Sequence, residues 1–457
     1  MLNYRIIARA FAGLIGLEGL LFLVCWLVGL GYGETHHSTW YIPIGICAAL
    51  SVILGLLGGK GPTRFERRDG FFIVAMVWLI YCALGMLPFL FGGHLHRGSE
   101  AFFETMSGFT TTGSTAFTNI DDLPHSILLW RSVTHWVGGM GIIFFTLALL
   151  PALGIGEQEL FTAEATGLKL GKLHSRVSTT AHYLWSTYLF VTIACAIAYR
   201  ICGMNTFDAI NHSFAAIATG GFSTHTANIA YFHSPAIEYV SVVVMFLGAT
   251  NFTLLYFVLF KRRFKLFWRD EELRLFILLI FGFTAVCTLS QWWHSHDFTE
   301  HGFRESLFYV VSMMSTTGFT TENFMTWPHL TWISLLIVSA IGSCTGSTSG
   351  GIKVVRVLAG IKVVRNEIHH VLHPRSIRPL RINSDYITPE VLQSIFAFLC
   401  CFTVLMVIGV IVFVTLGYPV FDSLGLSISA YSNVGPGIGY SLGPLDSWSE
   451  LPDTGLW

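Results

Sequence analysis

Four short stretches rich in glycine, threonine and serine carry oxygen atoms that could bind a cation. They are centred on Gly113, Gly220, Gly318 and Gly435, about a hundred residues apart. Glycine tolerates backbone dihedrals that other residues avoid, so a loop built around it can turn several carbonyl oxygens toward one point. Carbonyls without amide partners can replace the water around a dehydrated cation. The four loops therefore predict the parts of an ion selectivity filter.

Each loop follows a segment of roughly a dozen helix-compatible residues, which is shorter than the ~20 residues needed to cross a bilayer. Four acidic residues lie 13, 12, 13 and 13 positions upstream of the glycines: Glu100, Asp208, Glu305 and Asp422. A carboxylate stabilises the positive N-terminal end of a helix, and Ser99 and Thr206 are candidate N-caps beside two of them. The negative helix ends would then face the loops and favour a cation. We therefore expect four re-entrant pore helices.

An ordinary explanation exists for any single loop, because glycine, serine and threonine are common in the extracellular turns that join helices. Four equivalent loops, each after a non-spanning segment with an acidic start, favour the filter. Irregular backbone at membrane depth is tolerated only where it is buried in protein or lines a water-filled path.

The segments that position these loops are strongly apolar. The 457 residues are 53% hydrophobic and 12% charged, with a mean hydropathy of +0.62, which is typical of an all-α polytopic membrane protein. About nine runs reach the length of a membrane span: 6–32, 40–58, 70–93, 125–150, 178–202, 235–260, 272–293, 328–349 and 389–416. Basic residues gather after every second run, at 60–68, 169–176, 261–269 and 353–381. The positive-inside rule then predicts a cytoplasmic N-terminus.

Internal repetition predicts the domain organisation. Two leading transmembrane helices occupy residues 1–69, and four channel-like repeats of helix, re-entrant pore helix, filter loop and helix follow. The predicted repeats are 70–177, 178–270, 271–387 and 388–457. The segment after Gly435 contains no further apolar run, so we expect the fourth repeat to lack its last helix.

The run GSCTGSTSGG, residues 342–351, predicts a gate. The 14 residues from Pro328 to Ile341 rise only ~21 Å as a helix, less than the ~30 Å hydrocarbon core, so the polar run begins within the membrane. A flexible backbone there would lie just below the filter, where it could block a pore and move aside. The alternative is a helix that frays into the cytosol through a linker. A phosphate-binding loop is disfavoured because the GxxxxGK[ST] spacing is missing.

The motifs FTTTGST, IATGGFST, MSTTGFTT and SNVGPGIG, together with WRSVTHWVGGMGII and GSCTGSTSGGIKVVR, resemble the bacterial TrkH/TrkG/KtrB potassium transporter family, most of all its TrkH branch. The resemblance covers essentially the whole chain. It implies potassium uptake across the bacterial inner membrane by a homodimer in which each protomer holds its own pore. It also implies a cytosolic nucleotide-binding regulatory subunit like TrkA, with K⁺ as the transported ion and no other cofactor or metal.

Carried over by position, the resemblance assigns the K⁺-binding carbonyls to three residues of each loop. They are Thr111, Thr112, Gly113, Ala218, Thr219, Gly220, Thr316, Thr317, Gly318, Asn433, Val434 and Gly435. In related plant proteins a serine in place of the first glycine accompanies sodium permeation, and all four positions here are glycine. The resemblance also assigns an intramembrane gating role. Its residues are Gly342, Ser343, Thr345, Gly346, Ser347, Thr348, Ser349, Gly350 and Gly351, with Lys353 and Arg356 just beyond.

Two other functions stay open. A sodium-coupled or Na⁺-permeable cation transporter would share this fold. A membrane-embedded enzyme would need a group such as His135, His182 or the Asp121/Asp122 pair, but the chain lacks the HExxH and GxSxG patterns, and we predict that it is not an enzyme.

The basic clusters at 261–269 and 353–381 are candidate docking sites for the regulatory subunit. The positive-inside rule and contact with lipid headgroups would also place basic residues there. Besides that subunit and a second copy of the chain, we expect contacts with membrane lipids and none with nucleic acid.

Overall fold

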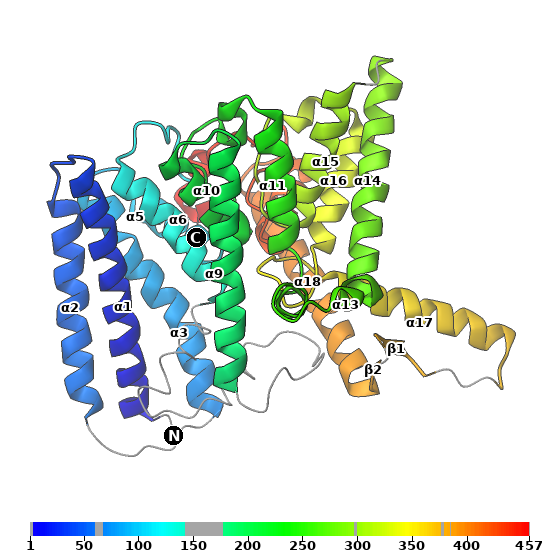
Figure 1. Ribbon diagram of the computed structural model, residues 1–457, viewed down its shortest axis with the longest axis horizontal. Coiled ribbons are helices and arrows are strands. Elements are labelled where there is room, and N and C mark those ends of the chain that lie inside the picture. The colour runs from blue at the N-terminus through cyan, green and yellow to red at the C-terminus, as the bar shows by residue number, and fades with distance from the viewer. Residues whose placement is uncertain are drawn as a thin grey trace. The chain divides into compact units, whose positions relative to one another are not determined.

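The described part of the protein is mostly helical in the computed structural model (Figure 1). The structure describes residues 3–59, 67–141, 177–296, 299–375, 379–383 and 385–456. These residues form two compact units. The first contains the described residues up to 231 together with 447–456, and the second runs from 232 to 446. The predicted all-α class is confirmed, since the described strands β1 (Arg381–Ile382) and β2 (Asp385–Tyr386) form only a short antiparallel pair.

Among the described residues, six helices are long and apolar enough to cross a membrane, or seven if a bent pair counts as one span. The chain is therefore a multi-pass membrane protein. The long helices are α1 (Tyr4–Gly31), α2 (Ser38–Gly58), α3 (Arg67–Gly85) with its continuation α4 (Leu87–Phe91), α9 (Val177–Ile201), α14 (Glu271–Ser295) and α18 (Pro389–Thr415). Of the predicted run at 125–150, residues 142–150 lie outside the described residues.

In the first unit, α1 packs against α2, α3 and α6. The remaining helices are α5 (Gly98–Phe109), α6 (His125–Gly139), α10 (Thr206–Ile217) and α20 (Asp453–Leu456), with 3-10 turns at Asn228–Phe232 and Trp448–Glu450. Helix α6 contacts both α5 and α10, so it joins the two short helices that precede the first two loops.

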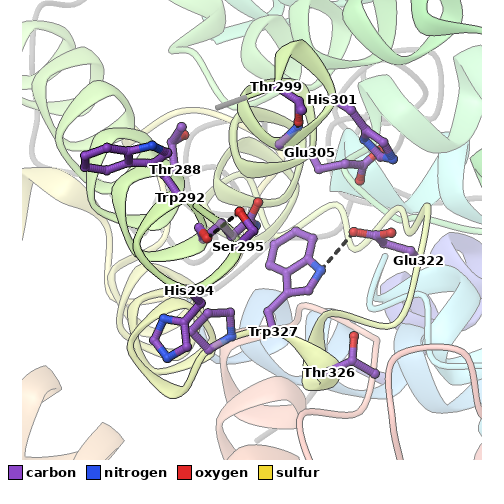
Figure 2. A pocket seen from close by; sticks show the side chains of 13 residues that line it. Thr288, Trp292, His294, Ser295, Thr299, His301, Glu305, Glu322, Thr326 and Trp327 are labelled. Atoms are coloured by element: carbon purple, nitrogen blue, oxygen red, sulfur yellow. Dashed lines mark hydrogen bonds and ion pairs between the residues drawn. The ribbon is translucent and has the colours of Figure 1, made fainter. Parts of the chain in front are cut away.

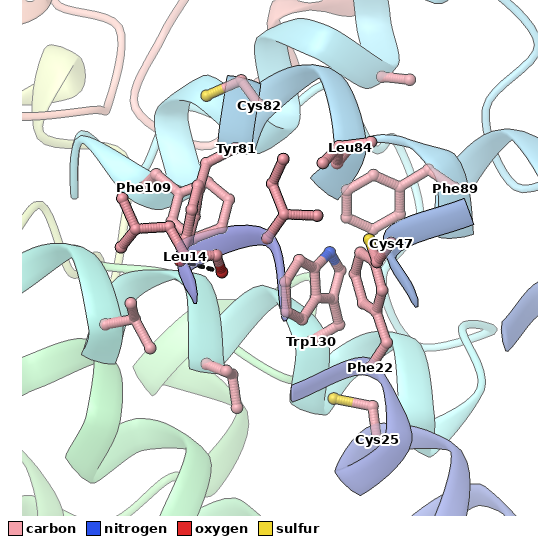
Figure 3. Packing of buried hydrophobic residues seen from close by; sticks show 14 of the residues in the cluster. Leu14, Phe22, Cys25, Cys47, Tyr81, Cys82, Leu84, Phe89, Phe109 and Trp130 are labelled. Atoms are coloured by element: carbon pink, nitrogen blue, oxygen red, sulfur yellow. Dashed lines mark hydrogen bonds between the residues drawn. The ribbon is translucent and has the colours of Figure 1, made fainter. Parts of the chain in front are cut away.

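Buried aromatic side chains fix the position of α5 in this unit (Figure 3). The rings of Phe22 and Trp130 lie 4.7 Å apart, and those of Tyr81 and Phe109 lie 5.3 Å apart. The Trp130 indole donates to the Gly85 carbonyl at 3.0 Å, so its polar edge is satisfied in the core. Phe109 is the last residue of α5 and is fully buried. The first loop therefore starts from a fixed point.

The second unit repeats this plan. Helix α16 contacts both α15 and α19, as α6 contacts α5 and α10 in the first unit. The helices here, besides α14 and α18, are α11 (Pro235–Gly248), α12 (Phe252–Leu259), α13 (Phe264–Arg269), α15 (Glu300–Met314), α16 (His329–Ile341), α17 (Val354–Leu372) and α19 (Val420–Ser432), with a 3-10 turn at Phe324–Thr326.

The four predicted short helices are present as α5, α10, α15 and α19, with 12, 12, 15 and 13 residues. The predicted N-caps are wrong. Asn205 caps α10 by accepting the N–H of Asp208 at 2.8 Å, and Thr206 is the first helical residue. Ser99 lies inside α5, whose N-cap is Arg97. Asparagine is a better N-cap than threonine, so residue type already favoured Asn205, one position before the predicted Thr206.

Candidate functional site

The four glycine loops share one backbone conformation. Each begins with a residue of positive φ: Thr111 (58°), Thr219 (53°), Thr316 (56°) and Asn433 (63°). Two residues later each has a glycine of positive φ: Gly113 (85°), Gly221 (83°), Gly318 (74°) and Gly435 (105°). The left-handed region costs other residues about 1–2 kcal/mol, so the second position favours glycine and the first is held by its surroundings.

The register of the second loop is one residue later than predicted, because the sequence analysis aligned Gly220 with Gly113. In every loop the residue between the two positive-φ positions donates its N–H to the carbonyl five residues earlier, at 2.8 to 2.9 Å: Thr112, Gly220, Thr317 and Val434. Gly220 is thus a middle residue, Gly221 matches Gly113, and Ala218 is the C-cap of α10. With this register Asp208 also lies 13 residues before its glycine, as in the other three loops.

The loops approach each other in pairs within each unit. A Cβ atom on Gly113 would lie 2.0 Å from the carbonyl oxygen of Gly220 in the first unit. A Cβ atom on Gly318 would lie 2.1 Å from the carbonyl oxygen of Val434 in the second. Glycine is therefore required at both positions by the close approach as well as by φ, and in each pair a backbone carbonyl of one loop lies against the glycine of the other.

Three of the predicted carboxylates hold the outer parts of their loops. Asp208 accepts the hydroxyl of Thr224 at 2.7 Å, and Glu305 accepts that of Thr321 at 2.5 Å. Asp422 accepts two backbone N–H groups of the fourth loop at 3.1 and 2.8 Å. These side chains anchor loops in addition to lying at helix N-termini.

The first loop uses a different carboxylate. Glu100, which the spacing selects, forms an ion pair with Arg97 at 2.5 Å. Glu104, one helical turn further on, accepts the N–H of Ala116 at 2.7 Å and the hydroxyl of Thr115 at 3.0 Å. Sequence reasoning missed Glu104, although its place four residues after Glu100, on the same helix face, was a usable signal.

Residues 342–351 form an irregular loop between α16 and α17. The N–H of Gly350 donates to the hydroxyl of Thr316 at 2.7 Å. A Cβ atom on Gly350 would lie 2.3 Å from the carbonyl oxygen of Ser432, immediately before the fourth loop. The 342–351 loop therefore contacts the third loop directly and packs closely against the start of the fourth.

A broken helix, which sequence analysis missed, receives the 342–351 loop. The predicted span at 235–260 is two helices, α11 and α12, bent by 106°. The carbonyls of Gly248 and Ala249 accept N–H groups from the 342–351 loop at 3.4 and 3.2 Å, and the N–H of Phe252 donates to the loop at 3.0 Å. Backbone groups freed by the break are thus satisfied within the protein. The sequence did contain a signal for this break, because Asn251 is a typical N-cap residue and caps the start of α12.

Two charged side chains fasten the 342–351 loop. The Lys353 ammonium donates to the carbonyl of Ser349 and to two serine hydroxyls at 3.0 and 3.3 Å. Glu272, 2% exposed in the first turn of α14, accepts the N–H groups of Thr345 at 2.6 Å and Val355 at 3.1 Å. Lys353 therefore holds the loop rather than only adding charge near it, and Glu272 is a contact that sequence reasoning did not find.

Arg356, in the first turn of α17, links α17 to α18. Its guanidinium donates to the carbonyl of Ile352 at 2.7 Å and lies 3.8 Å from the ring of Phe398 on α18.

A surface cavity of about 470 Å³ is lined by residues of α14, of α15 and of the segment 322–328, and Figure 2 shows its lining. Glu305 and Glu322 contribute carboxylates, and the Trp327 indole donates to Glu322 at 2.8 Å. The lining does not include the loop residues 316–318. Within the described ranges, no group of three or more His, Cys, Asp or Glu side chains could hold a metal ion.

Of the side chains considered for an enzyme, His135, Asp121 and Asp122 have structural partners. His135 bonds the carbonyl of Gly108 at 2.8 Å and accepts the N–H of Phe222 at 3.2 Å. Asp121 bonds His225 at 2.8 Å, and Asp122 accepts Asn119 at 2.5 Å.

Known proteins are similar to this chain in sequence and in fold. The family model of TrkH, described as a cation transport protein, matches residues 36–448. The Trk system potassium uptake protein TrkH of Escherichia coli K12 is 35% identical, over 96% of this chain and 94% of that protein. The Trk system potassium uptake protein TrkG of the same organism is 34% identical, over 96% of this chain and 90% of that protein. The crystal structure of the potassium transporter TrkH from Vibrio parahaemolyticus aligns with a TM-score of 0.88 at 33% identity, covering 100% of this chain and 94% of that one. These relatives are transporters and not enzymes, and the chain belongs to the TrkH family of cation transport proteins.

Proposed function

We propose that this protein takes up potassium ions across the bacterial inner membrane, with its N-terminus in the cytoplasm. The observation that supports this most is the conformation shared by the four loops, in which Gly113 and Gly318 each lie against a backbone carbonyl of a neighbouring loop. Relatives over nearly the whole chain are named potassium uptake proteins. Each loop lies within one of the four proposed repeats, which span residues 70–177, 178–270, 271–387 and 388–457.

The proposed ion-binding groups are the backbone carbonyls of three consecutive residues in each loop. They are Thr111 to Gly113, Thr219 to Gly221, Thr316 to Gly318 and Asn433 to Gly435. The second set begins at Thr219 rather than Ala218, because the hydrogen-bond register of Gly220 matches that of Thr112. Carbonyls in a fixed arrangement replace the hydration shell of one cation better than that of another, which is the basis of selectivity.

The 342–351 loop is the proposed gate. It bonds to Thr316 and packs against Ser432, so it lies next to the third and fourth loops. The break between α11 and α12 and the Glu272 carboxylate hold it there. Because these are hydrogen bonds of modest net energy, a partner with a few kcal/mol of differential binding can move the loop.

The proposed partners are a second copy of the chain and a cytosolic nucleotide-binding subunit. Relatives are named as components of a Trk system. Exposed basic residues on α13 and α17 offer a surface for an acidic partner.

The test is growth of a potassium-uptake-deficient bacterium at low K⁺, followed by K⁺ and Na⁺ flux into proteoliposomes under matched gradients. Restored growth and a K⁺ flux well above the Na⁺ flux are expected. Equal fluxes of the two ions in folded protein would refute the proposed selectivity, and a Na⁺-dependent K⁺ flux would show the coupled alternative.

A further inference from the structure

Two opposite charges are buried behind the first two loops. Arg131 on α6 and Glu104 on α5 are each 1% exposed, and the Arg131 Nε donates to Glu104 at 2.8 Å. Removing such a pair from water costs several kcal/mol per ion, and well-packed apolar residues often stabilise a fold equally well. The pair therefore calls for an explanation other than stability.

The guanidinium reaches both loops at equivalent positions. Its Nη1 donates to the carbonyl of Ser223 at 2.9 Å, and its Nη2 donates to the hydroxyl of Thr115 at 3.2 Å. Thr115 lies two residues after Gly113, and Ser223 lies two residues after Gly221. Because the guanidinium is planar and rigid, it fixes the directions of both contacts at once.

Glu104 completes the connection on the side of the first loop. Its carboxylate accepts the N–H of Ala116 and the hydroxyl of Thr115 as well as Arg131. The Thr115 hydroxyl in turn accepts the N–H of Phe117 at 3.1 Å. The first loop is thus bound to both members of the ion pair.

One helical turn along α6, His135 holds the second loop. The N–H of Phe222 donates to its Nε2, so the ring proton lies on Nδ1 and is donated to the carbonyl of Gly108 on α5. The Phe222 ring lies 4.2 Å from the Arg131 guanidinium and 4.0 Å from the His135 ring. Phe222 immediately follows Gly221, so these contacts act directly next to the loop glycine.

The second unit shows that the fold does not need the charge. Helices α6 and α16 both begin with a histidine after a proline N-cap, and counting from those starts places Leu335 at the position of Arg131. Leu335 is fully buried. The third loop bonds to the Glu305 carboxylate through the Thr321 hydroxyl, and to the uncharged Tyr309, whose hydroxyl accepts the N–H of Thr321 at 2.8 Å. A buried apolar residue is therefore sufficient for packing at this place in the repeat.

We propose that Arg131 is a positioning residue, which with Glu104 fixes the spacing of the first two loops and thereby the preference for K⁺ over Na⁺. The inference rests on the proposed function of these loops as a filter. Ion preference depends on where loop carbonyls lie, and Arg131 bridges the two loops through single, directional hydrogen bonds.

The test uses substitutions that change the geometry and keep the volume. Arg131→Lys keeps the charge but loses the fork, and Thr115→Val removes only the hydroxyl that Arg131 and Glu104 share. Both should lower the ratio of K⁺ to Na⁺ flux by about tenfold, which corresponds to one hydrogen bond to a charged group. Thr115→Ser should restore the ratio. Ser132→Ala is the matched control, because this buried hydroxyl donates to the carbonyl of Leu128 on its own helix at 3.2 Å.

The outcomes separate this inference from the proposed function. A selective wild-type protein with unchanged ratios in folded Arg131→Lys and Thr115→Val, judged by size-exclusion chromatography, would overturn the positioning role and leave the filter standing. A wild-type protein without ion preference would overturn the filter and the inference with it. If Arg131→Lys does not fold, the nearly isosteric Thr115→Val decides the question. An equal fall of the flux ratio in Ser132→Ala would show a general effect of losing a buried hydroxyl, and would also overturn the positioning role.

Discussion

Replacing Gly113 by serine should lower the preference for K⁺ over Na⁺ more than it lowers total flux. Gly113 has a φ of 85°, a region that costs a residue with a side chain about 1–2 kcal/mol. Its added Cβ atom would lie 2.0 Å from the carbonyl oxygen of Gly220, whereas ordinary contact begins at 3.4 Å. The nearest atoms all belong to backbone, so no side chain can rotate away. The carbonyl must move by more than an ångström or the loop must leave its conformation.

A displaced carbonyl cannot replace hydration water at the same distance, and this distance separates the two ions. If this strain weakens K⁺ binding by about 1.4 kcal/mol, the ratio of K⁺ to Na⁺ flux drops about tenfold. The assay is K⁺ and Na⁺ flux in proteoliposomes containing folded Gly113→Ser protein. Gly98→Ser is the matched control from the same repeat, because nothing lies within 4 Å of a Cβ atom there. Unchanged ratios in both Gly113→Ser and Gly318→Ser would refute the assignment of these loops as a filter.

Three further perturbations test the gate, the partner and the outer loop. Removing several residues from the 342–351 loop should raise K⁺ flux and reduce its dependence on the regulatory subunit, whereas equal or lower flux in folded protein would identify a linker. Charge reversal of exposed basic residues in the 353–381 segment should weaken co-purification with that subunit at unchanged membrane insertion, and intact co-purification would leave these charges as lipid contacts. Burial lowers the pKa of His225, but its hydrogen bonds to Asp208 and Asp121 outweigh this and raise that pKa above 6.5. Its stabilising contribution is then complete below pH 6.5 and lost as the pH rises through the higher folded value. The difference in melting temperature between wild type and His225→Gln should therefore shrink with rising pH, and a difference independent of pH would contradict the ion-pair role.

The short helices could be predicted because the bilayer sets a minimum length for a span. Segments of about a dozen residues before a glycine loop cannot cross it, and α5 and α10 have the expected length. The break between α11 and α12 could not be predicted in the same way. Its freed backbone groups bond to the 342–351 loop, about a hundred residues further along the chain. A hydropathy pattern contains no information about such distant hydrogen-bond partners.

The register of the second loop shows a second limit. The stretch IATGGF offers two adjacent glycines, and composition does not say which one takes the positive φ. The constant spacing of 13 residues from Asp208 to Gly221 favoured the later one, but only the hydrogen bond of Gly220 settles its register. Arg131 was visible in the motif WRSVTHW, yet its contact with Ser223 joins residues 92 positions apart, which no local pattern reveals.

Threonine at the first positive-φ position of three loops carries a mechanical consequence. A β-branched residue resists this conformation, so the backbone is strained where the proposed ion-binding carbonyls turn. The hydroxyls of Thr111 and Thr219 donate to the carbonyl of the preceding residue at 2.6 and 2.7 Å, which stabilises the turn locally. The hydroxyl of Thr316 accepts the N–H of Gly350 instead. The strained residue of the third loop is therefore stabilised by the proposed gate itself. Movement of the 342–351 loop would remove that bond, so the third loop is a point of direct contact between the proposed gate and the proposed filter.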